Sequence, residues 1–237
     1  MTKYFKYFIY LYVLIGYSLS NAGSYEDFFS AIQNDRPEVI QKLLGRGFDP
    51  NSPNEKGIPA LVLASQSGAT KSALVLARHP DTKIDLPNSL NETPLMLAAI
   101  NNQLELAQAL IERGADINRK GWTPLHYAAT RGHRDMMRLL LDNDAYIDSE
   151  SDNGTTPLMM AAYYAPPLAV KLLLEAGADP TLFNQGNASA LDLALSADHQ
   201  QSAFYIRAFT EAWFIENPIK EERQEEKEAS PSQPPLN

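Results

Sequence analysis

The stretch TPLHYAATRGH, residues 123–133, decides the fold of this 237-residue chain. Thr123 can cap a helix, because its hydroxyl can accept a hydrogen bond from a backbone N–H two or three residues on. Pro124 then occupies the first helical position, where a missing N–H costs no hydrogen bond. Gly132 suits a sharp turn, because glycine adopts positive φ without a steric penalty. The stretch therefore predicts a short helix followed by a tight turn.

The same pattern recurs through the chain at intervals of about 33 residues. One apolar column has spacings of 33, 34, 30, 33 and 33, and an alanine follows three positions after each member. The column comprises Phe28, Leu61, Leu95, Leu125, Leu158 and Leu191. A second apolar column, fifteen residues after the first, predicts the buried stripe of a second helix and comprises Leu43, Leu76, Leu110, Leu140 and Leu173. One copy cannot bury both of its helices alone, so stacking of the copies must supply the core.

These residues resemble the ankyrin repeat, a 33-residue unit with the signature T-P-L-H-x-A. The resemblance extends over residues 23–216, with copies expected at 24–56, 57–90, 91–120, 121–153, 154–186 and 187–216. It implies an all-α solenoid of about six stacked helix-turn-helix repeats with short β-hairpin loops. In this family the histidine of the motif hydrogen-bonds across neighbouring turns, so the resemblance implies a structural role for His126. Copy four follows the signature closely, whereas copies one, two and six diverge from it.

Residues 1–22 have the composition of a secretory signal peptide. A positively charged start precedes an apolar run over residues 7–19, and Ser20 and Ala22 are small residues placed for cleavage before Gly23. The run is shorter than the roughly 20 residues of a transmembrane helix. An exported chain without cysteine needs no oxidative folding, so we expect the periplasm as its destination. The alternatives are an uncleaved anchor in the inner membrane and secretion.

The last segment, residues 217–237, differs in composition from the repeats. It holds five glutamates and four prolines and has no apolar periodicity, which predicts a disordered acidic and proline-rich tail. Such a tail either improves solubility or carries a short interaction motif.

Charge and composition exclude several classes of function. The formal net charge of −9 repels phosphate backbones, so we expect no nucleic-acid partner. The absence of cysteine excludes disulfides, cysteine-ligated metals and thiol nucleophiles. The four histidines have no metal-ligand spacing, and the turn aspartates, Asp148 among them, are expected to bond their own backbone. No phosphate-binding loop, G-x-S-x-G or H-E-x-x-H motif occurs. We therefore expect no catalytic residue, no metal and no cofactor.

The resemblance places partner contacts on the concave face, at the residue before each threonine and at the two residues after each second alanine. The partner-binding residues implied in this way are Ile58, Glu92, Ile100, Asn101, Trp122, Thr130, Arg131, Tyr163 and Tyr164. Tryptophan, tyrosine and arginine dominate the energetics of protein interfaces, and nothing structural calls for an indole at Trp122. The alternative for Tyr163 and Tyr164 is that they pack against a neighbouring loop.

These observations predict a non-catalytic protein–protein interaction module that is exported and binds one protein partner through copies three to five. The resemblance to exported bacterial ankyrin proteins implies a partner enzyme or toxin under its control. An inner-membrane-tethered scaffold and a host-directed effector are the alternatives. Retention of residues 1–22 in the mature mass would favour the tethered scaffold, and detection in host cytosol would favour the effector.

Overall fold

The structure, a computed structural model, describes residues 23–216, and every regular element in that range is an α-helix. This confirms the all-α repeat stack. The predicted signal peptide (1–22) and tail (217–237) lie outside the described residues. After a helix at residues 23–33 the chain forms α2 (Pro37–Leu44), α3 (Ala60–Ser67), α4 (Thr70–Arg78), α5 (Pro94–Ile100), α6 (Leu104–Glu112), α7 (Pro124–Arg131), α8 (Arg134–Leu141), α9 (Pro157–Tyr164), α10 (Pro167–Glu175), α11 (Ala190–Ser196) and α12 (Gln200–Glu216).

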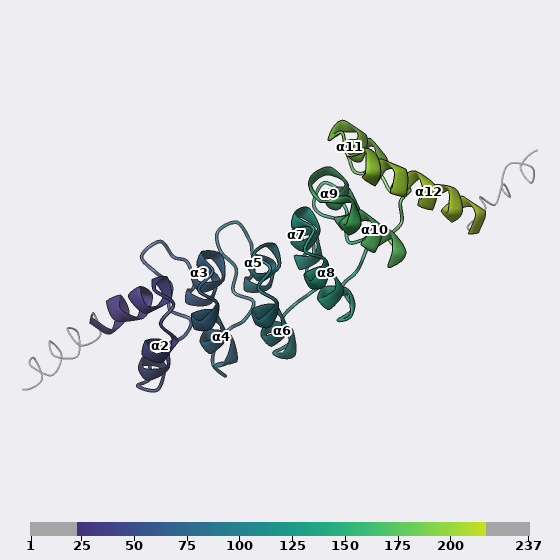
Figure 1. The fold of residues 1–237 in the computed structure, drawn as a ribbon. Helices are drawn as coiled ribbons and strands as arrows, with labels where there is room; N and C mark the ends of the chain where they lie inside the picture. Colours follow the sequence, from purple (N-terminus) through teal and green to yellow (C-terminus); the bar gives the residue numbers. More distant parts are fainter. Residues whose placement is uncertain (1–22, 217–237) are drawn as a thin grey trace, which may run out of the picture.

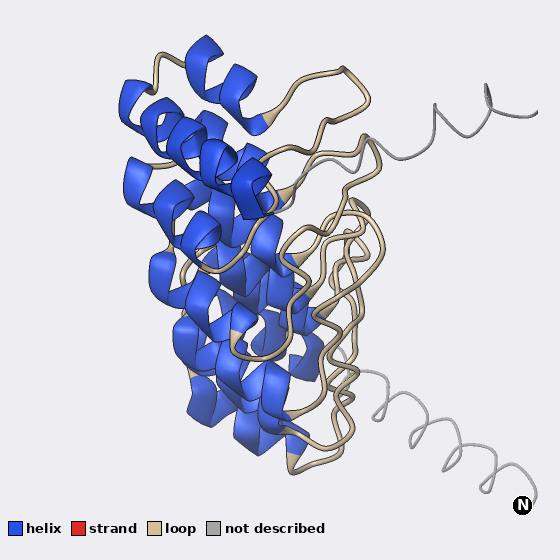
Figure 2. Ribbon diagram, turned by 90° about the vertical axis from the view of Figure 1, so that its right-hand side faces the viewer, coloured by secondary structure: helices blue, strands red, loops and turns tan. Residues whose placement is uncertain are grey.

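The helices form two rows that run the length of an elongated stack (Figure 1). The inner row continues from residues 23–33 through α3, α5, α7, α9 and α11, and the outer row holds the even-numbered helices. Long loops between successive pairs project to one side of the stack (Figure 2). We call the surface made by the inner row and these loops the inner face; it corresponds to the concave face of the predictions.

Local signals start and stop most inner helices as the sequence predicts. The hydroxyl cap predicted for Thr123 is the exception, because Thr123 Oγ1 lies 2.8 Å from Nδ1 of His126 instead. Thr93 Oγ1 accepts from the N–H of Met96 at 3.3 Å, and Thr156 Oγ1 caps α9 in the same way. Gly132 ends α7 at φ 66°, where a Cβ would lie only 2.8 Å from the ring of Pro166. Asp144 takes the left-handed position after α8 at φ 63°, where other copies have glycine.

Both apolar columns are buried in one continuous core. Leu125 and Leu158 of the first column and Leu140 and Leu173 of the second are fully inaccessible. Leu191, in the last copy, is only half-buried because no further copy covers it. Stacking therefore supplies the core, as the repeat pattern requires.

The loops contain no β-strand within residues 23–216, so the expectation of short β-hairpins is wrong. Backbone pairing is limited to two isolated bridges, one between Pro53 and Pro59 and an equivalent one near α11. The first bridge does not extend into a ladder, because the N–H of Ser52 bonds the carbonyl oxygen of Asp49 and the N–H of Ile58 bonds a side chain. Asn54 Oδ1 accepts from the N–H of Ile58 at 2.9 Å, which closes the loop as a side-chain turn.

An asparagine or aspartate side chain in the loop after each of the first four copies accepts a hydrogen bond from the backbone of the next copy; we call this contact a loop bracket. Asn51, Asp85, Asn118 and Asp148 occupy equivalent positions and accept from backbone N–H groups about 30 residues further on, at 2.7, 3.2, 2.7 and 3.1 Å. The prediction that Asp148 bonds its own loop is therefore wrong, because the N–H of the following copy lies within reach. The brackets hold neighbouring loops in register along the stack.

Arg113 stabilises an irregular turn after α4, where His79 and Pro80 replace the glycine of other copies. Its guanidinium donates to the carbonyl oxygens of Ala77 at 2.5 Å and His79 at 2.7 Å, and also reaches those of Pro80 and Thr82. Copy three therefore supplies the cap that copy two lacks.

Candidate functional site

The structure brings three of the nine predicted partner-binding residues together. Trp122, which precedes α7, and Tyr163 and Tyr164, at the end of α9, line one hollow of about 270 Å³ on the inner face. Met159, Met160 and Leu193 supply its aliphatic walls, and Asn153, Thr155 and Asn184 supply polar edges. We call this set of residues the aromatic hollow.

The three rings of the aromatic hollow remain open to solvent. Exposed fractions are 37% for Trp122, 40% for Tyr163 and 58% for Tyr164. The two tyrosine rings meet edge to face, with centroids 4.6 Å apart. Within residues 23–216, neither tyrosine hydroxyl nor the Trp122 indole N–H has a hydrogen-bond partner. The rings thus offer both apolar area and unpaired polar atoms to a ligand.

His126 supports the aromatic hollow from beneath Trp122. Its ring meets the Trp122 indole edge-on, with centroids 5.3 Å apart. Nε2 bonds the carbonyl oxygen of Thr155 in the next copy at 2.9 Å, and Nδ1 bonds the N–H of Thr123 at 3.1 Å. Burial lowers the pKa of His126 to about 4, so the imidazole is neutral at pH 7. The structural role implied for His126 is confirmed.

Three other predicted residues are held by contacts that serve the fold. Glu92 is half-buried and accepts from the Tyr127 hydroxyl at 3.2 Å. Burial of the Tyr127 hydroxyl raises its pKa to about 12, and the negative charge of Glu92 is the second largest cause of the increase. Thr130 donates to the carbonyl oxygen of His126 at 2.8 Å. The Asn101 amide donates to the carbonyl oxygen of Ser65 at 3.1 Å.

The remaining predicted residues lie apart from the aromatic hollow. Ile100 ends α5 half-buried, and its carbonyl oxygen bonds His133 Nε2 at 3.0 Å. Arg131 ends α7 exposed, with no ion pair or hydrogen bond from its side chain within the described part of the chain. Ile58 lies in a different hollow, near the first copy.

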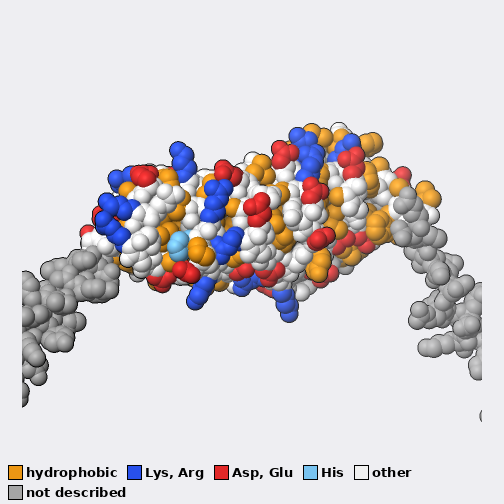
Figure 3. All heavy atoms as spheres, turned by 90° about the horizontal axis from the view of Figure 1, so that it is seen from below, with side chains coloured by type: hydrophobic (Ala, Val, Ile, Leu, Met, Phe, Trp, Pro, Cys, Tyr) orange, Lys and Arg blue, Asp and Glu red, His pale blue; other side chains and the backbone are white. Residues whose placement is uncertain are grey.

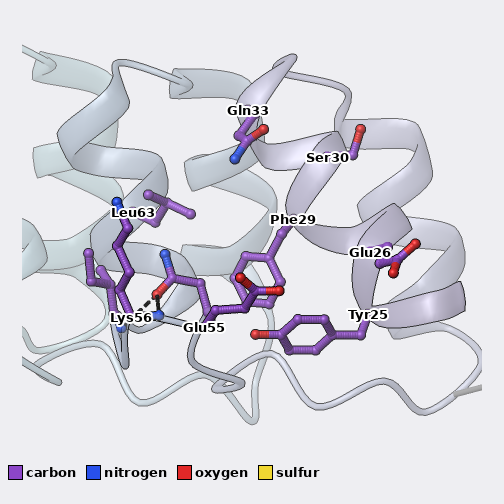
Figure 4. A pocket seen from close by; sticks show the side chains of 10 residues that line it. Tyr25, Glu26, Phe29, Ser30, Gln33, Glu55, Lys56 and Leu63 are labelled. Carbon is purple, nitrogen blue, oxygen red and sulfur yellow. Dashed lines mark hydrogen bonds between the residues drawn. The ribbon is translucent and has the colours of Figure 1, made fainter. Parts of the chain in front are cut away.

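This second hollow, of about 420 Å³, was not predicted. Figure 4 shows Tyr25 and Phe29 facing Glu55, Lys56 and Leu63 across it. It occupies the same place in the repeat as the aromatic hollow, because Phe29 and Met159 each follow a member of the first apolar column by one residue, and Leu63 and Leu193 each follow one by two. The signal available in the sequence was Tyr25, which stands three residues before its column member, as Trp122 does.

On the outer face, the exposed aromatic rings of the described residues, Phe204 at 63% and Phe214 at 47%, lie on α12. Charged side chains of both signs are spread over this face (Figure 3). Its ion pairs, Arg78–Glu105, Arg138–Asp135 and Lys171–Glu175, have half-exposed to largely exposed side chains, and such pairs contribute little free energy. Charges spaced in this way are typical of a solvated surface.

Residues 23–216 contain neither a cluster of metal-ligating side chains nor a membrane-spanning helix. No three or more histidine, aspartate or glutamate side chains there are grouped to hold a metal ion. No helix in that range has the length and apolar character needed to cross a membrane. His133 and His199 instead bond backbone carbonyl oxygens of the preceding copy.

Comparison with known families decides the identity of the fold. The family model described as "Ankyrin repeats (3 copies)" matches residues 28–120 and 118–184. The chain belongs to the ankyrin repeat family. Ankyrin repeat domains are typically non-catalytic binding modules, and they bind proteins.

Relatives with known sequences are much longer proteins. The chain is 32% identical over 161 residues to the nuclear factor NF-kappa-B p105 subunit of Gallus gallus, and 31% identical over 169 residues to the ankyrin repeat and KH domain-containing protein mask-1 of Caenorhabditis elegans. These matches cover 65% and 69% of this chain but only 16% and 6% of those proteins.

Solved bacterial ankyrin structures share the fold over nearly their whole length. An ankyrin repeat domain from Acinetobacter baumannii AYE matches with a TM-score of 0.67 at 24% identity, covering 76% of this chain and 95% of that domain. A chain from the complex of a Bdellovibrio bacteriovorus predatory endopeptidase with its immunity protein also matches with a TM-score of 0.67 at 24% identity. It covers 77% of this chain and 97% of that chain. Likeness at this identity shows the fold.

Proposed function

We propose that this ankyrin repeat protein is a non-catalytic module that binds one protein partner at the aromatic hollow of its inner face. The observation that carries the proposal is the convergence of Trp122, Tyr163 and Tyr164 from two copies on one open hollow. Aromatic anchors that fill or line a pocket supply most of the binding energy in protein interfaces. Pro166 and Pro167 follow the tyrosines and stiffen the turn, which lowers the entropy lost on docking.

We further propose that the protein is exported to the bacterial periplasm and that the partner is an enzyme or toxin that it restrains. The fold likeness to a complex of an endopeptidase with an immunity protein supports this choice of partner. The composition of residues 1–22 supports export. The membrane-tethered scaffold and the host-directed effector remain the competing proposals.

Affinity capture with the full chain tests the partner site. The bait is compared with a variant carrying Trp122→Ala, Tyr163→Ala and Tyr164→Ala, in extracts of the source cell's envelope. A matched control carries Leu168→Ala and Phe204→Ala, which removes side chains exposed by 50% and 63% from α10 and α12. We expect one enzyme to be retained by the wild-type and control baits and lost from the aromatic variant. Equal retention on all three baits would show that the aromatic hollow is not the site.

The mass of the mature protein tests export. Cleavage after Ala22 is expected to remove the first 22 residues, and the product should be released with the periplasmic fraction. A full-length mass in the membrane fraction would instead favour the tethered scaffold.

A further inference from the structure

The aromatic hollow suits a partner side chain better than a small-molecule ligand. Its volume of about 270 Å³ is below the roughly 300–1,000 Å³ of small-molecule sites. No lysine, arginine, aspartate, glutamate or histidine lines it. Its three rings present π-systems whose faces carry partial negative charge. The charged side chains around the three rings therefore indicate which kind of partner side chain the hollow binds.

Two carboxylates flank Trp122 on opposite sides along the stack. On the side of copy three, Glu92 accepts from the Tyr127 hydroxyl at 3.2 Å, and the Tyr127 ring lies 6.3 Å from the Trp122 ring. On the side of copy five, Asp152 Oδ1 lies 3.1 Å from where a Cβ on Gly121 would be. Asp152 is exposed, and its carboxylate accepts no hydrogen bond within residues 23–216.

Acidic residues outnumber basic ones in the chain that follows α8 up to residue 206. Residues 139–206 contain nine aspartates and glutamates, no arginine, one histidine and a single lysine, Lys171. Lys171 lies on the outer row and pairs with Glu175 at 3.0 Å. Arg131 is at the end of α7, outside the lining of the hollow. Arg119 and Lys120 precede Trp122 in the same loop, but Arg119 donates to the Asn91 side chain at 2.7 Å and neither base lines the hollow. A cation that enters the hollow therefore meets an uncharged aromatic surface flanked by the carboxylates of Glu92 and Asp152.

We infer that the aromatic hollow receives an arginine or lysine side chain from a basic segment of the partner. The cation lies against the rings of Trp122 and the tyrosines, between Glu92 and Asp152. Cation–π attraction is strongest for tryptophan, and flanking carboxylates add to it at low salt. This inference rests on the proposed function, because it names the chemistry of the partner at the same site.

Titration with a single amino-acid probe tests the inference without the partner. The probe is N-acetyl-arginine amide, and its uncharged counterpart is N-acetyl-citrulline amide. The chain has two tryptophans, so the indole N–H signal of Trp122 is identified with Trp122→Phe, and Trp213 in α12 serves as the internal reference. We expect saturable shifts of the Trp122 signal with the arginine probe and at least fivefold weaker binding of the citrulline probe. Equal shifts from both probes, or none from either, would overturn the inference.

Charge-only variants separate this inference from the proposed function. Glu92→Gln with Asp152→Asn keeps the three rings and, through the amide oxygen of Gln, an acceptor for the Tyr127 hydroxyl. It removes both flanking charges and the second oxygen of Glu92, which accepts from Asn88 Nδ2 at 2.7 Å. Asp135→Asn with Glu175→Gln removes the same charge from the outer face as a control. We expect the first pair to weaken both the arginine probe and the captured partner about fivefold, since an exposed charge pair accounts for a factor of roughly 1.4–5. A partner held unchanged by the first pair, yet lost from the triple aromatic variant, would overturn the cation inference alone.

Discussion

At the scale of single residues, the protonation state of His126 determines the hydrogen bonds that hold two copies together next to the aromatic hollow. The carbonyl oxygen of Thr155 can only accept, so Nε2 carries the hydrogen, and Nδ1 accepts from the N–H of Thr123. With the ring neutral, both nitrogens are satisfied, and Thr123 Oγ1 also lies 2.8 Å from Nδ1. Protonating Nδ1 would remove the acceptor of the Thr123 N–H and leave a charge buried between two copies.

We predict that this histidine makes the free energy of unfolding depend on pH. The pKa of His126 is about 4 when folded and near 6.5 when unfolded, so the unfolded chain binds the proton first as pH falls. Stability is therefore complete above pH 6.5 and decreases towards pH 4. Between pH 7 and pH 4.5 the loss attributable to His126 should be about 2 kcal/mol.

The matched variant is His126→Met, because Met96 and Met159 occupy the equivalent position and their sulfurs accept the same threonine N–H. Urea unfolding of both proteins at the two pH values gives the difference that the histidine causes. A wild-type pH dependence no steeper than that of the variant would contradict the assignment of a neutral, buried imidazole.

At the scale of elements, the loop brackets alternate between neutral and charged acceptors. Asn51 and Asn118 accept from an N–H of the next copy and also donate their amides to the carbonyl oxygens of Asp81 and Asp144, at 2.9 and 2.7 Å. Asp85 can only accept when ionised, and burial raises its pKa. The structure thus places a carboxylate at a site where an amide forms an additional hydrogen bond.

We predict that Asp85→Asn and Asp148→Asn each stabilise the stack. Burial is the largest cause of the raised pKa at both positions, so the charged form is disfavoured in the folded state. An amide removes that cost and can donate to the carbonyl oxygen two residues before the bracketed N–H, which contributes about 0.5–1.5 kcal/mol. Urea unfolding at pH 7 measures the change. The reverse change, Asn118→Asp, should destabilise by a similar amount, and a stabilising Asn118→Asp would contradict the account.

At the scale of the whole molecule, the parts that the sequence predicts are those fixed within one copy. Thr93 and Gly132 set helix ends by local geometry, and the Leu125 column sets the core, so the all-α repeat stack follows from the sequence. The β-hairpins could not be excluded from the sequence, because their absence depends on whether Asn54 or a neighbouring strand takes the N–H of Ile58.

The site is less predictable because it forms between copies. Trp122, Tyr163 and Tyr164 are implied one by one from their repeat positions, but their convergence with Leu193 of copy six depends on how the copies stack. The hollow beside Tyr25 went unpredicted because copy one keeps only the spacing of the repeat. Glu92 accepts a hydrogen bond from Tyr127, which lies 35 residues further on in the next copy. The sequence around Glu92 gives no sign of this contact.

Nearest-neighbour stacking also predicts how damage to the core spreads. Leu140 is fully buried in α8, so Leu140→Ala should lower the free energy of unfolding in urea by about 2–5 kcal/mol. Leu139 is half-buried one residue away, so Leu139→Ala should lower it by less. Each copy touches only its neighbours, so hydrogen exchange should accelerate most in α7 and α8, then in α6 and α10, and least in α12. A cost below about 0.5 kcal/mol would contradict the burial of Leu140. Equal acceleration in every helix would instead mean that the copies unfold as one cooperative unit rather than as coupled neighbours.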